Sequence, residues 1–595
     1  MRLTVVLLAT LCAGFVRAQT GCQTTPTYKP CEIVLELSDD ALKAHPNPVA
    51  SVDLWGEFRS PAPKFRTHRL PAYWDGGKRM VIRFSPEDPG AWTWRVTGNV
   101  PELDGKQGQV TATESEREGF LRPANLHFWI HPESLKPHLW MGDDHADLFT
   151  MQRGVFDRLV AARAAQKFTH LRGLVLAPAA TPFTSPDQPD LAYFAEMDAR
   201  MKALDERGLV TDLVLAPDSA SLEKAFPEWA QRERFLKYVV ARYAAFNVSW
   251  EIAAAFEGLP GGRNIIKELG VALRRYDPYN HPGSCGAQVT SSPLLGDKWM
   301  SHLIENSPDP AVSAIEHQQY PLPQVSTGFA PAGATGAAFR KGLWEATMAG
   351  TWPTSRISGI ENAETKAMQT WAETISEARY WELEPYFELD GGRAVALSGV
   401  EYLVYIEKPG PLSIFVEKHS YDVYWINPAT GERIHEKKDW KGEEFTDQPP
   451  DKTHDWILHL SRDGHKAGML KSYKFESQPN QLQEVETSVA RIPYELLTPK
   501  PDETTLAPGR PAPFQIRLRK ETKGTRRMMY MLTGEVVLDG SGMRVLGTGA
   551  SGTLNIPREM LVSEKGVLNV RIEGLNAAGK LYALDVVFPV LRAGP

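Results

Sequence analysis

The chain has 595 residues, with 66 Lys and Arg against 73 Asp and Glu, so its formal net charge is −7. At roughly 100 to 200 residues per domain, this length predicts about three to five domains and excludes a single small module. The acidic balance provides no basic field of the kind that nucleic-acid binding needs, and 42% hydrophobic residues exclude a disordered or fibrous chain.

Residues 1–18 are typical of a cleaved signal peptide. Arg2 precedes an apolar run over residues 3–16, and Val16-Arg17-Ala18 has the small-x-small pattern of a cleavage site. No later run reaches the roughly 18 consecutive apolar residues of a membrane span. We therefore expect an exported protein, secreted or periplasmic, that does not span a membrane.

Removal of residues 1–18 leaves three cysteines, Cys22, Cys31 and Cys285. Cys22 and Cys31 lie close together in the sequence, and an oxidising compartment favours a disulfide between them, within a short N-terminal segment over residues 19–31. Cys285 is then left unpaired, and its surroundings predict a small buried side chain rather than a nucleophile.

The region over residues 32–115 predicts an immunoglobulin-like β-sandwich. Short runs of alternating apolar and polar residues, such as Trp92-Thr93-Trp94-Arg95-Val96, lie between turn clusters such as Asp75-Gly76-Gly77. Strands at roughly 8 to 12 residue spacing without a helical period are typical of a sandwich.

Residues 123–384 predict a (β/α)₈ barrel, because helical patterns alternate with short apolar strands that suit a buried parallel sheet. Neither a Gly-x-Gly-x-x-Gly turn nor a P-loop follows a strand, which disfavours a doubly wound sheet and a nucleotide cofactor. The expected helices cover residues 154–166, 192–207, 228–245, 262–276, 337–349 and 363–380, and the expected strands cover 139–141, 170–176, 212–216, 247–252, 313–315 and 324–325.

Helical patterns end after residue 384. Residues 385–475 alternate again and predict a second β-sandwich, residues 476–513 contain a Pro-rich stretch and predict a linker, and residues 514–595 predict a final β-sandwich. The fold class expected for the whole chain is therefore a central barrel flanked by β-sandwich domains.

In such a barrel, chemistry belongs to the loops at the carboxyl ends of the strands. Hydrolysis of a glycosidic bond needs two carboxyl groups roughly 5 to 9.5 Å apart, beside a sugar that packs on an aromatic face. The polar residues expected at these strand ends are Asp143, Asp144, Asp218, Glu251, Glu257, Glu316, His317 and Gln319, with Trp352 as the aromatic residue.

Each of these residues also has a structural interpretation. Asp143 or Asp144 could cap the following helix, Glu251 could bond to a neighbouring strand, and Glu316 with His317 could form a satisfied pair at the barrel rim. The sequence has no His or Cys spacing typical of zinc and no Gly-x-Ser-x-Gly turn, so we expect no metal, no other cofactor and no serine nucleophile.

Several motifs, in their order and spacing, resemble the apiosidase-like family of secreted bacterial glycoside hydrolases over about residues 32–475. The resemblance implies a (β/α)₈ barrel preceded by an immunoglobulin-like domain and followed by a sandwich named for collagen binding. The motifs are Gly142-Asp143-Asp144-His145-Ala146-Asp147-Leu148-Phe149, Arg163-Ala164-Ala165-Gln166-Lys167-Phe168-Thr169-His170-Leu171-Arg172, Tyr238-Val239-Val240-Ala241-Arg242-Tyr243, Tyr276-Asp277-Pro278-Tyr279-Asn280-His281-Pro282, Leu343-Trp344-Glu345-Ala346 and Trp381-Glu382-Leu383-Glu384-Pro385.

This sequence departs from the pattern of that family at both catalytic positions. The resemblance implies an acid/base carboxylate a few residues after Trp250, where Ala255 stands, and a second carboxylate after the seventh strand, where Gly328 stands. Neither alanine nor glycine can donate a proton or attack an anomeric carbon.

Three hypotheses follow for a protein whose expected partner is a carbohydrate. The first is a glycoside hydrolase whose carboxylates have migrated, with Glu257 as acid/base and Glu316 or Asp143 as its partner. The second is an inactive carbohydrate-binding homologue, with Asp143, Asp144, His317, Gln319 and Trp352 around the mouth. The third is a wall- or matrix-binding structural protein in which the barrel is a scaffold.

Overall fold

A computed structural model of the chain describes residues 21–124, 126–178, 180, 182–462, 490–491, 494–501, 503–518, 529–536, 544–557, 565–576, 579 and 581–591. The predicted signal peptide over residues 1–18 lies outside this range. The chain divides into two compact units, Met1–Arg117 with Tyr238–Ala245, and Glu118–Lys237 with Phe246–Pro595. Among the described residues, no helix is both long and apolar enough to cross a membrane.

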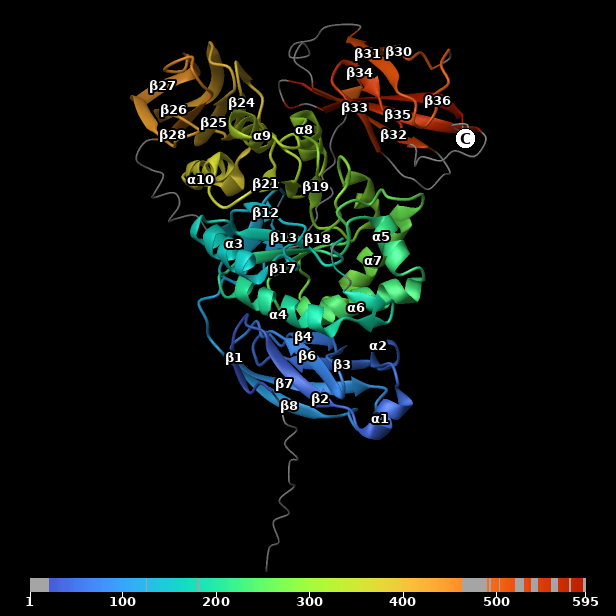
Figure 1. Cartoon of the computed structure of the whole chain (residues 1–595). Helices are drawn as coiled ribbons and strands as arrows, with labels where there is room; N and C mark the ends of the chain where they lie inside the picture. Colours follow the sequence, from blue (N-terminus) through green and yellow to red (C-terminus); the bar gives the residue numbers. More distant parts are fainter. Residues whose placement is uncertain are drawn as a thin grey trace, which may run out of the picture. The chain divides into compact units, whose positions relative to one another are not determined.

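The first unit contains a two-sheet sandwich, as the alternating runs predicted (Figure 1). A five-stranded sheet in the order β1-β8-β7-β3-β4 and a three-stranded sheet in the order β2-β6-β5 pack through Phe58 and Phe84, whose rings stack at 4.1 Å. The elements are β1 (Thr24–Pro26), β2 (Cys31–Glu36), α1 (Asp39–Ala44), α2 (Pro48–Ser51), β3 (Leu54–Arg59), β4 (Thr67–Pro71), β5 (Tyr73–Trp74), β6 (Arg79–Phe84), β7 (Gly90–Gly98) and β8 (Gln107–Thr113).

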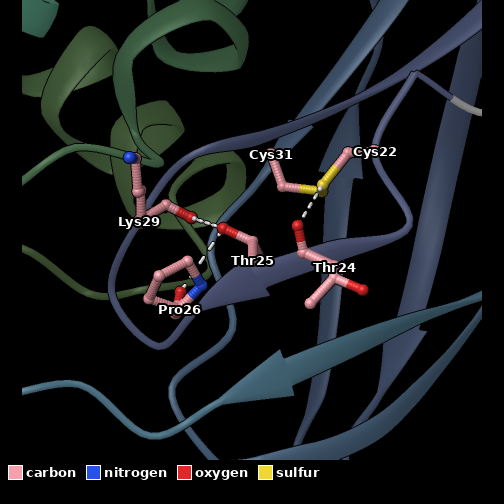
Figure 2. Close-up of a disulfide and its surroundings, with 6 residues drawn as sticks. All are labelled: Cys22, Thr24, Thr25, Pro26, Lys29 and Cys31. Atoms are coloured by element: carbon pink, nitrogen blue, oxygen red, sulfur yellow. Dashed lines mark hydrogen bonds between the residues drawn. A yellow bond between two sulfur atoms is a disulfide. The ribbon is translucent and has the colours of Figure 1, made fainter.

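The predicted disulfide between Cys22 and Cys31 joins the segment before β1 to the start of β2, and its Cα atoms lie 5.7 Å apart (Figure 2). In the turn between the two strands, the Thr25 hydroxyl donates to the Lys29 carbonyl at 3.2 Å. Cys285 is buried and unpaired, as expected.

The centre of the second unit is a barrel of eight parallel strands in the order β18-β17-β16-β13-β12-β21-β20-β19 (Figure 1). The barrel closes between β18 and β19, where Ser301 donates its backbone N–H to Gly283 at 2.8 Å and Ser284 donates its hydroxyl to the His302 carbonyl at 2.7 Å. The strands are β12 (Gly142–Asp144), β13 (His170–Leu174), β16 (Val210–Val214), β17 (Val248–Glu251), β18 (Gly283–Ser284), β19 (Leu303–Glu305), β20 (Gln324–Ser326) and β21 (Trp352–Ser355).

Several helices between these strands begin at a side chain that accepts a backbone N–H, the usual role of an N-cap residue. Asp190, Asp218, Asp309 and Asn362 cap α4, α5, α8 and α10 in this way. The helices are α3 (Arg153–Ala165), α4 (Leu191–Asp205), α5 (Ser219–Ala225), α6 (Trp229–Tyr243), α7 (Gly262–Tyr276), α8 (Pro310–Gln319), α9 (Gly336–Met348) and α10 (Ala363–Ser376), with short 3₁₀ turns η1 (Ser292–Asp297) and η2 (Tyr380–Glu382).

The prediction of a strand over residues 313–315 is wrong. These residues lie inside α8, and the sixth strand is β19, ten residues earlier. Asp309 caps α8 and Pro310 opens its first turn, and both features favour a helix. Glu316 and His317 therefore lie on a helix and not on a loop at a strand end.

Two small sheets accompany the barrel. Residues before the first barrel strand form a three-stranded sheet in the order β11-β10-β9, and the long segment after β13 folds into a hairpin. Their strands are β9 (Arg122–Pro123), β10 (Trp129–His131), β11 (Lys136–His138), β14 (Phe183–Ser185) and β15 (Gln188–Pro189).

The region after the barrel forms one seven-stranded antiparallel sheet rather than two separate sheets. The long strand β26 pairs with β28, β27 and β23, and residues from most of these strands enclose one apolar cluster around Trp425. The strands are β22 (Glu384–Tyr386), β23 (Leu389–Asp390), β24 (Arg393–Leu397), β25 (Glu401–Ile406), β26 (Leu412–Ile426), β27 (Arg433–Asp447) and β28 (Trp456–Arg462).

The last region is a sandwich of five and three strands with one shared core. It begins earlier than expected, because β29 and β30 belong to its two sheets although they lie within the predicted linker over residues 476–513. The strands are β29 (Ala490–Arg491), β30 (Tyr494–Thr498), β31 (Ala512–Leu518), β32 (Met529–Val536), β33 (Arg544–Thr548), β34 (Ser551–Leu554), β35 (Lys565–Leu575) and β36 (Leu581–Leu591).

Candidate functional site

Charged side chains fill the barrel towards the carboxyl ends of its strands. Alternate residues of a strand point to the same side of a sheet, so a polar residue at every second position of a barrel strand points inward. His170 and Arg172 occupy such positions on β13, Asp212 lies on β16, and Glu251 ends β17.

Arg172 is the centre of this charged group. Its guanidinium donates to both oxygens of Glu251 at 2.8 and 2.6 Å and to Asp144 at 3.0 Å. Such a two-point contact is the strong form of an ion pair. Burial raises the pKa of Glu251 although Arg172 lowers it, whereas for Asp144 the effect of burial is outweighed by Arg172 and Arg356, so the pKa of Asp144 lies below its ordinary value. Arg172 thus occupies both Glu251 oxygens.

Below Arg172, a row of buried histidines continues the polar interior. Asp212 bonds to His170 at 2.8 Å, His170 to His138 at 2.9 Å, and His138 to His131 at 3.0 Å. Burial raises the pKa of Asp212 well above its ordinary value and lowers the pKa values of His138 and His170 well below theirs. These pKa shifts favour uncharged side chains along the row, and its hydrogen bonds satisfy buried polar groups.

Asp143 and Asp144 are adjacent but have different surroundings. Asp143 is fully buried, and its oxygens accept from Arg163 at 2.6 Å, from His145 at 2.7 Å and from the backbone of Ile357 at 3.1 Å. Asp144 holds Arg172 and Arg356, and the Arg356 side chain is 72% exposed. Only Asp144 of the two therefore adjoins solvent-exposed charge.

The two positions that lack a carboxylate differ in the space around them. Ala255 is partly exposed in the loop after β17. A Cβ at Gly328, in contrast, would lie 2.5 Å from the backbone and the side-chain oxygen of Asn306. Asn306 therefore fills the space that a side chain at position 328 would need.

Glu257 lies two residues beyond Ala255 and accepts the backbone N–H of Gln288 at 3.1 Å. It is 8% exposed, and the neighbouring Phe256 packs under the guanidinium of Arg544 at 4.4 Å. Asp218, another strand-end candidate, caps α5. The structure thus gives Glu257 a fixed position next to a contact with the C-terminal sandwich.

Glu316, His317, Gln319 and Trp352 do not join the charged group around Arg172. Glu316 is fully buried and accepts the Thr290 hydroxyl at 2.6 Å, while Gln319 donates to Glu573 at 2.5 Å. Trp352 is the first residue of β21, so it lies at the amino end of the barrel. The expected convergence of these residues with Asp143, Asp144 and Glu257 at one mouth is therefore wrong, because the helix α8 carries Glu316 and His317 away from the strand ends.

His317 instead belongs to a second group, formed with His127 and Glu384. One nitrogen of each histidine and one carboxylate oxygen lie within 4.8 Å of one another. His317 was a predicted site residue and Glu384 stands in one of the motifs, but their grouping with His127 was not predicted, because the three residues come from distant segments. Arg172 was also missed, although its alternation with His170 in an otherwise apolar strand is a visible signal for two inward polar side chains.

A parallel eight-stranded barrel with charged side chains at the carboxyl ends of its strands is the architecture of many glycoside hydrolases. Residues 127–308 match the family model of the apiosidase-like catalytic domain, and residues 24–99 match a domain of unknown function, DUF5060. Residues 127–308 are therefore similar to the apiosidase-like catalytic domain, as the sequence motifs predicted. None of the curated proteins matches the chain in sequence.

Solved structures support the same fold. The chain is similar to a candidate glycoside hydrolase from Bacteroides vulgatus ATCC 8482, with a TM-score of 0.61 and 16% identity over 74% of this chain and 100% of the other. It is also similar to a second glycoside hydrolase, with a TM-score of 0.51 and 13% identity over 58% of this chain and 97% of the other. At this identity the likeness extends to the fold alone.

Proposed function

We propose that this protein binds an oligosaccharide or polysaccharide at the barrel mouth and does not hydrolyse it by the two-carboxylate mechanism. The observation that carries the proposal is the pair Ala255 and Gly328, of which the second has no room for a side chain beside Asn306. A glycosidase of the usual kind needs a carboxyl group on each side of the scissile bond.

The other candidate carboxylates of the barrel do not replace the two acids that are missing at positions 255 and 328. Glu316 and Asp143, the expected partners of Glu257, are both fully buried and already bonded, which leaves a sugar or a water no access to them. Both oxygens of Glu251 accept from Arg172. One oxygen of Asp144 pairs with Arg172 and the other with Arg356. None of these carboxylates is therefore available to act with Glu257 as the second catalytic group.

The mouth keeps features that suit binding. Leu174, Ala177 and Val214 form an apolar cluster at the ends of β13 and β16, with Ala146, Ala180 and Ala254 packed against it. Arg356, whose side chain is 72% exposed, and Asp144 provide charge at the mouth. Ligand sites combine mostly apolar walls with a few polar groups, and a sugar offers both C–H faces and hydroxyl groups.

We also propose that the protein is exported, secreted or periplasmic. The support is the predicted signal peptide over residues 1–18 together with the disulfide between Cys22 and Cys31, since disulfides persist in oxidising compartments.

A glycan array run beside a broad screen of aryl-glycoside hydrolysis tests the proposal. We expect the wild type to bind at least one glycan and to release no product, and we expect Arg356→Ala to weaken binding. Arg59→Ala is the matched control, because Arg59 is 68% exposed and pairs with Glu57 in the first unit. Absence of glycan binding, or hydrolysis by the wild type, would contradict the proposal.

A further inference from the structure

The group of His127, His317 and Glu384 brings two imidazole nitrogens to one carboxylate. Oxygen Oε2 of Glu384 lies 3.1 Å from Nδ1 of His127 and 2.5 Å from Nε2 of His317. One carboxylate oxygen therefore faces a nitrogen of each of two imidazole rings.

The other nitrogen of His127 fixes the tautomer of its ring. Nε2 of His127 lies 3.0 Å from the carbonyl oxygen of Tyr320, which can only accept a hydrogen bond, so Nε2 carries the proton. In the neutral ring, Nδ1 then presents a lone pair to the lone pairs of Glu384. A histidine that donates its far N–H to a backbone carbonyl while its near nitrogen faces an anionic ligand is the usual arrangement at a metal centre.

A neutral His317 can donate its Nε2–H to Glu384, so one extra proton, on His127, would also satisfy these contacts, whereas a second extra proton would make both rings cationic. The rings of His127 and His317 stack at 3.5 Å between centroids, and two imidazolium charges at that separation repel. Only 1% of the His317 side chain is exposed, so a charge on this ring would have little contact with water. A single cation bound by both near nitrogens would leave both rings neutral.

A small cavity lies beside the group. It has a volume of about 30 Å³ and is lined by His127, His317, Glu384, Phe128, Trp352 and Trp381. A water needs roughly 10 to 15 Å³, so an ion and one water fit, while a sugar does not. The Glu384 side chain is 41% exposed, which provides a path from solvent.

From these contacts we infer that His127, His317 and Glu384 form a binding site for a divalent transition-metal cation of the zinc type, with a water as the fourth ligand. Two imidazoles and one carboxylate suit Zn²⁺ and its neighbours rather than Mg²⁺ or Ca²⁺. Two ligands each about 2.0 to 2.1 Å from Zn²⁺ lie about 3.0 to 3.4 Å apart, which the His127–Glu384 pair already matches. The contact between Glu384 and His317, at 2.5 Å, must lengthen by about 1 Å to admit the ion.

The site would join three segments of the second unit. His127 precedes β10, His317 lies near the end of α8, and Glu384 is the first residue of β22. Because the ligands come together only in the folded chain, bound metal would stabilise it and would hold the amino end of the barrel to the sheet that follows.

The test is metal binding by the full chain. Protein stripped with a chelator is titrated with Zn²⁺, passed through a desalting column and analysed for metal, and the unfolding temperature is recorded with and without Zn²⁺. We expect one Zn²⁺ per chain, a higher unfolding temperature with the metal, and Co²⁺ absorption bands typical of four- or five-fold coordination.

Variants separate this site from adventitious binding. Glu384→Gln keeps an oxygen that can accept from either imidazole, so the fold is retained, but we expect it to lower zinc affinity by more than about 100-fold, since loss of an outer partner alone costs about 10- to 100-fold. His127→Gln should do the same, and it decides the question if Glu384→Gln does not fold. His419→Gln is the control, because His419 faces Glu417 at 3.7 Å without a third ligand in the described residues.

The inference is overturned if the wild type retains no zinc after desalting, or if zinc binding and the Co²⁺ spectrum are the same in Glu384→Gln and His127→Gln as in the wild type. In the first case the group is a hydrogen-bonded cluster and nothing more. In the second case the metal binds elsewhere on the chain.

Discussion

The two ends of the barrel differ in how their charged groups are satisfied. At the carboxyl end, Arg172 is held by Glu251 and Asp144, and each charge has a partner of opposite sign. At the amino end, Glu384 faces two imidazole nitrogens, one of which must lack a proton if its ring is neutral.

This difference shows that the position of a carboxylate does not by itself define an active site. The carboxyl end is where barrel enzymes carry their chemistry, yet here its carboxylates hold arginines. The amino end usually serves stability, yet here it holds the group of His127, His317 and Glu384 that we propose as a metal site. The partners of each carboxylate decide what it can do.

The largest expected effect comes from Arg172→Met, which leaves Glu251 and Asp144 without their common partner inside the barrel. Removal of one member of a buried ion pair costs about 3 to 5 kcal/mol, so we expect the free energy of unfolding in urea to fall by about that amount. Arg356→Ala is the matched control, since Arg356 also binds Asp144 but is exposed, and its effect should stay within about 0.5 kcal/mol. Equal losses in the two variants would show that the buried network is not what stabilises this end.

A second expected effect depends on pH and concerns Glu316. Burial raises the pKa of Glu316 to about 7, and burial together with the nearby Glu316 raises the pKa of Glu305 well above its ordinary value. A carboxyl group whose pKa is raised in the folded state stabilises the fold below its unfolded pKa, and this contribution is lost as pH rises through about 7.

We therefore expect Glu316→Gln to be more stable than the wild type at pH 8 by about 2 to 3 kcal/mol, and nearly equal to it at pH 4. The measurement is urea unfolding of both proteins across this pH range. A difference in stability between the two proteins that does not grow from pH 4 to pH 8 would contradict a raised pKa for Glu316.

A smaller loss of stability is expected for a substitution at Gly328, because a side chain at this position has no space beside Asn306. Gly328→Ala places a Cβ against the backbone of Asn306, and overpacking of this kind costs about 1 to 3 kcal/mol. Gly154→Ala is the control, because the nearest atom to its Cβ would be the end of the Arg158 side chain at 3.7 Å. If Gly328→Ala is as stable as Gly154→Ala by thermal unfolding, the space at position 328 is not filled as described.

Much of the fold could be predicted from the sequence, because the alternation of helices and apolar strands covers long segments. The error at residues 313–315 arose because Ser313-Ala314-Ile315 is too short to show a period and suits a buried strand and a buried helix equally well. Asp309 and Pro310, four and three residues before it, were the local signal for a helix. The strand β19 has only three residues, which is too few to show a period.

The candidate site was harder to predict than the fold. Spacing along the chain identified Asp144 and Glu257 as residues near strand ends, and it identified the missing acids at Ala255 and Gly328. It could not show that Arg172 pairs with Glu251, which lies 79 residues away, or that Glu384 meets His127, which lies 257 residues away. Contacts of that range depend on the register of the whole barrel.

The most direct test of the central claim is product formation from a glycan that the wild type binds, measured as new reducing ends over a long incubation. We predict that the wild type releases no more product than Glu257→Gln, and that both proteins bind the glycan with similar affinity. Steady release by the wild type that is lost in Glu257→Gln would contradict the account and would identify Glu257 as a migrated catalytic acid.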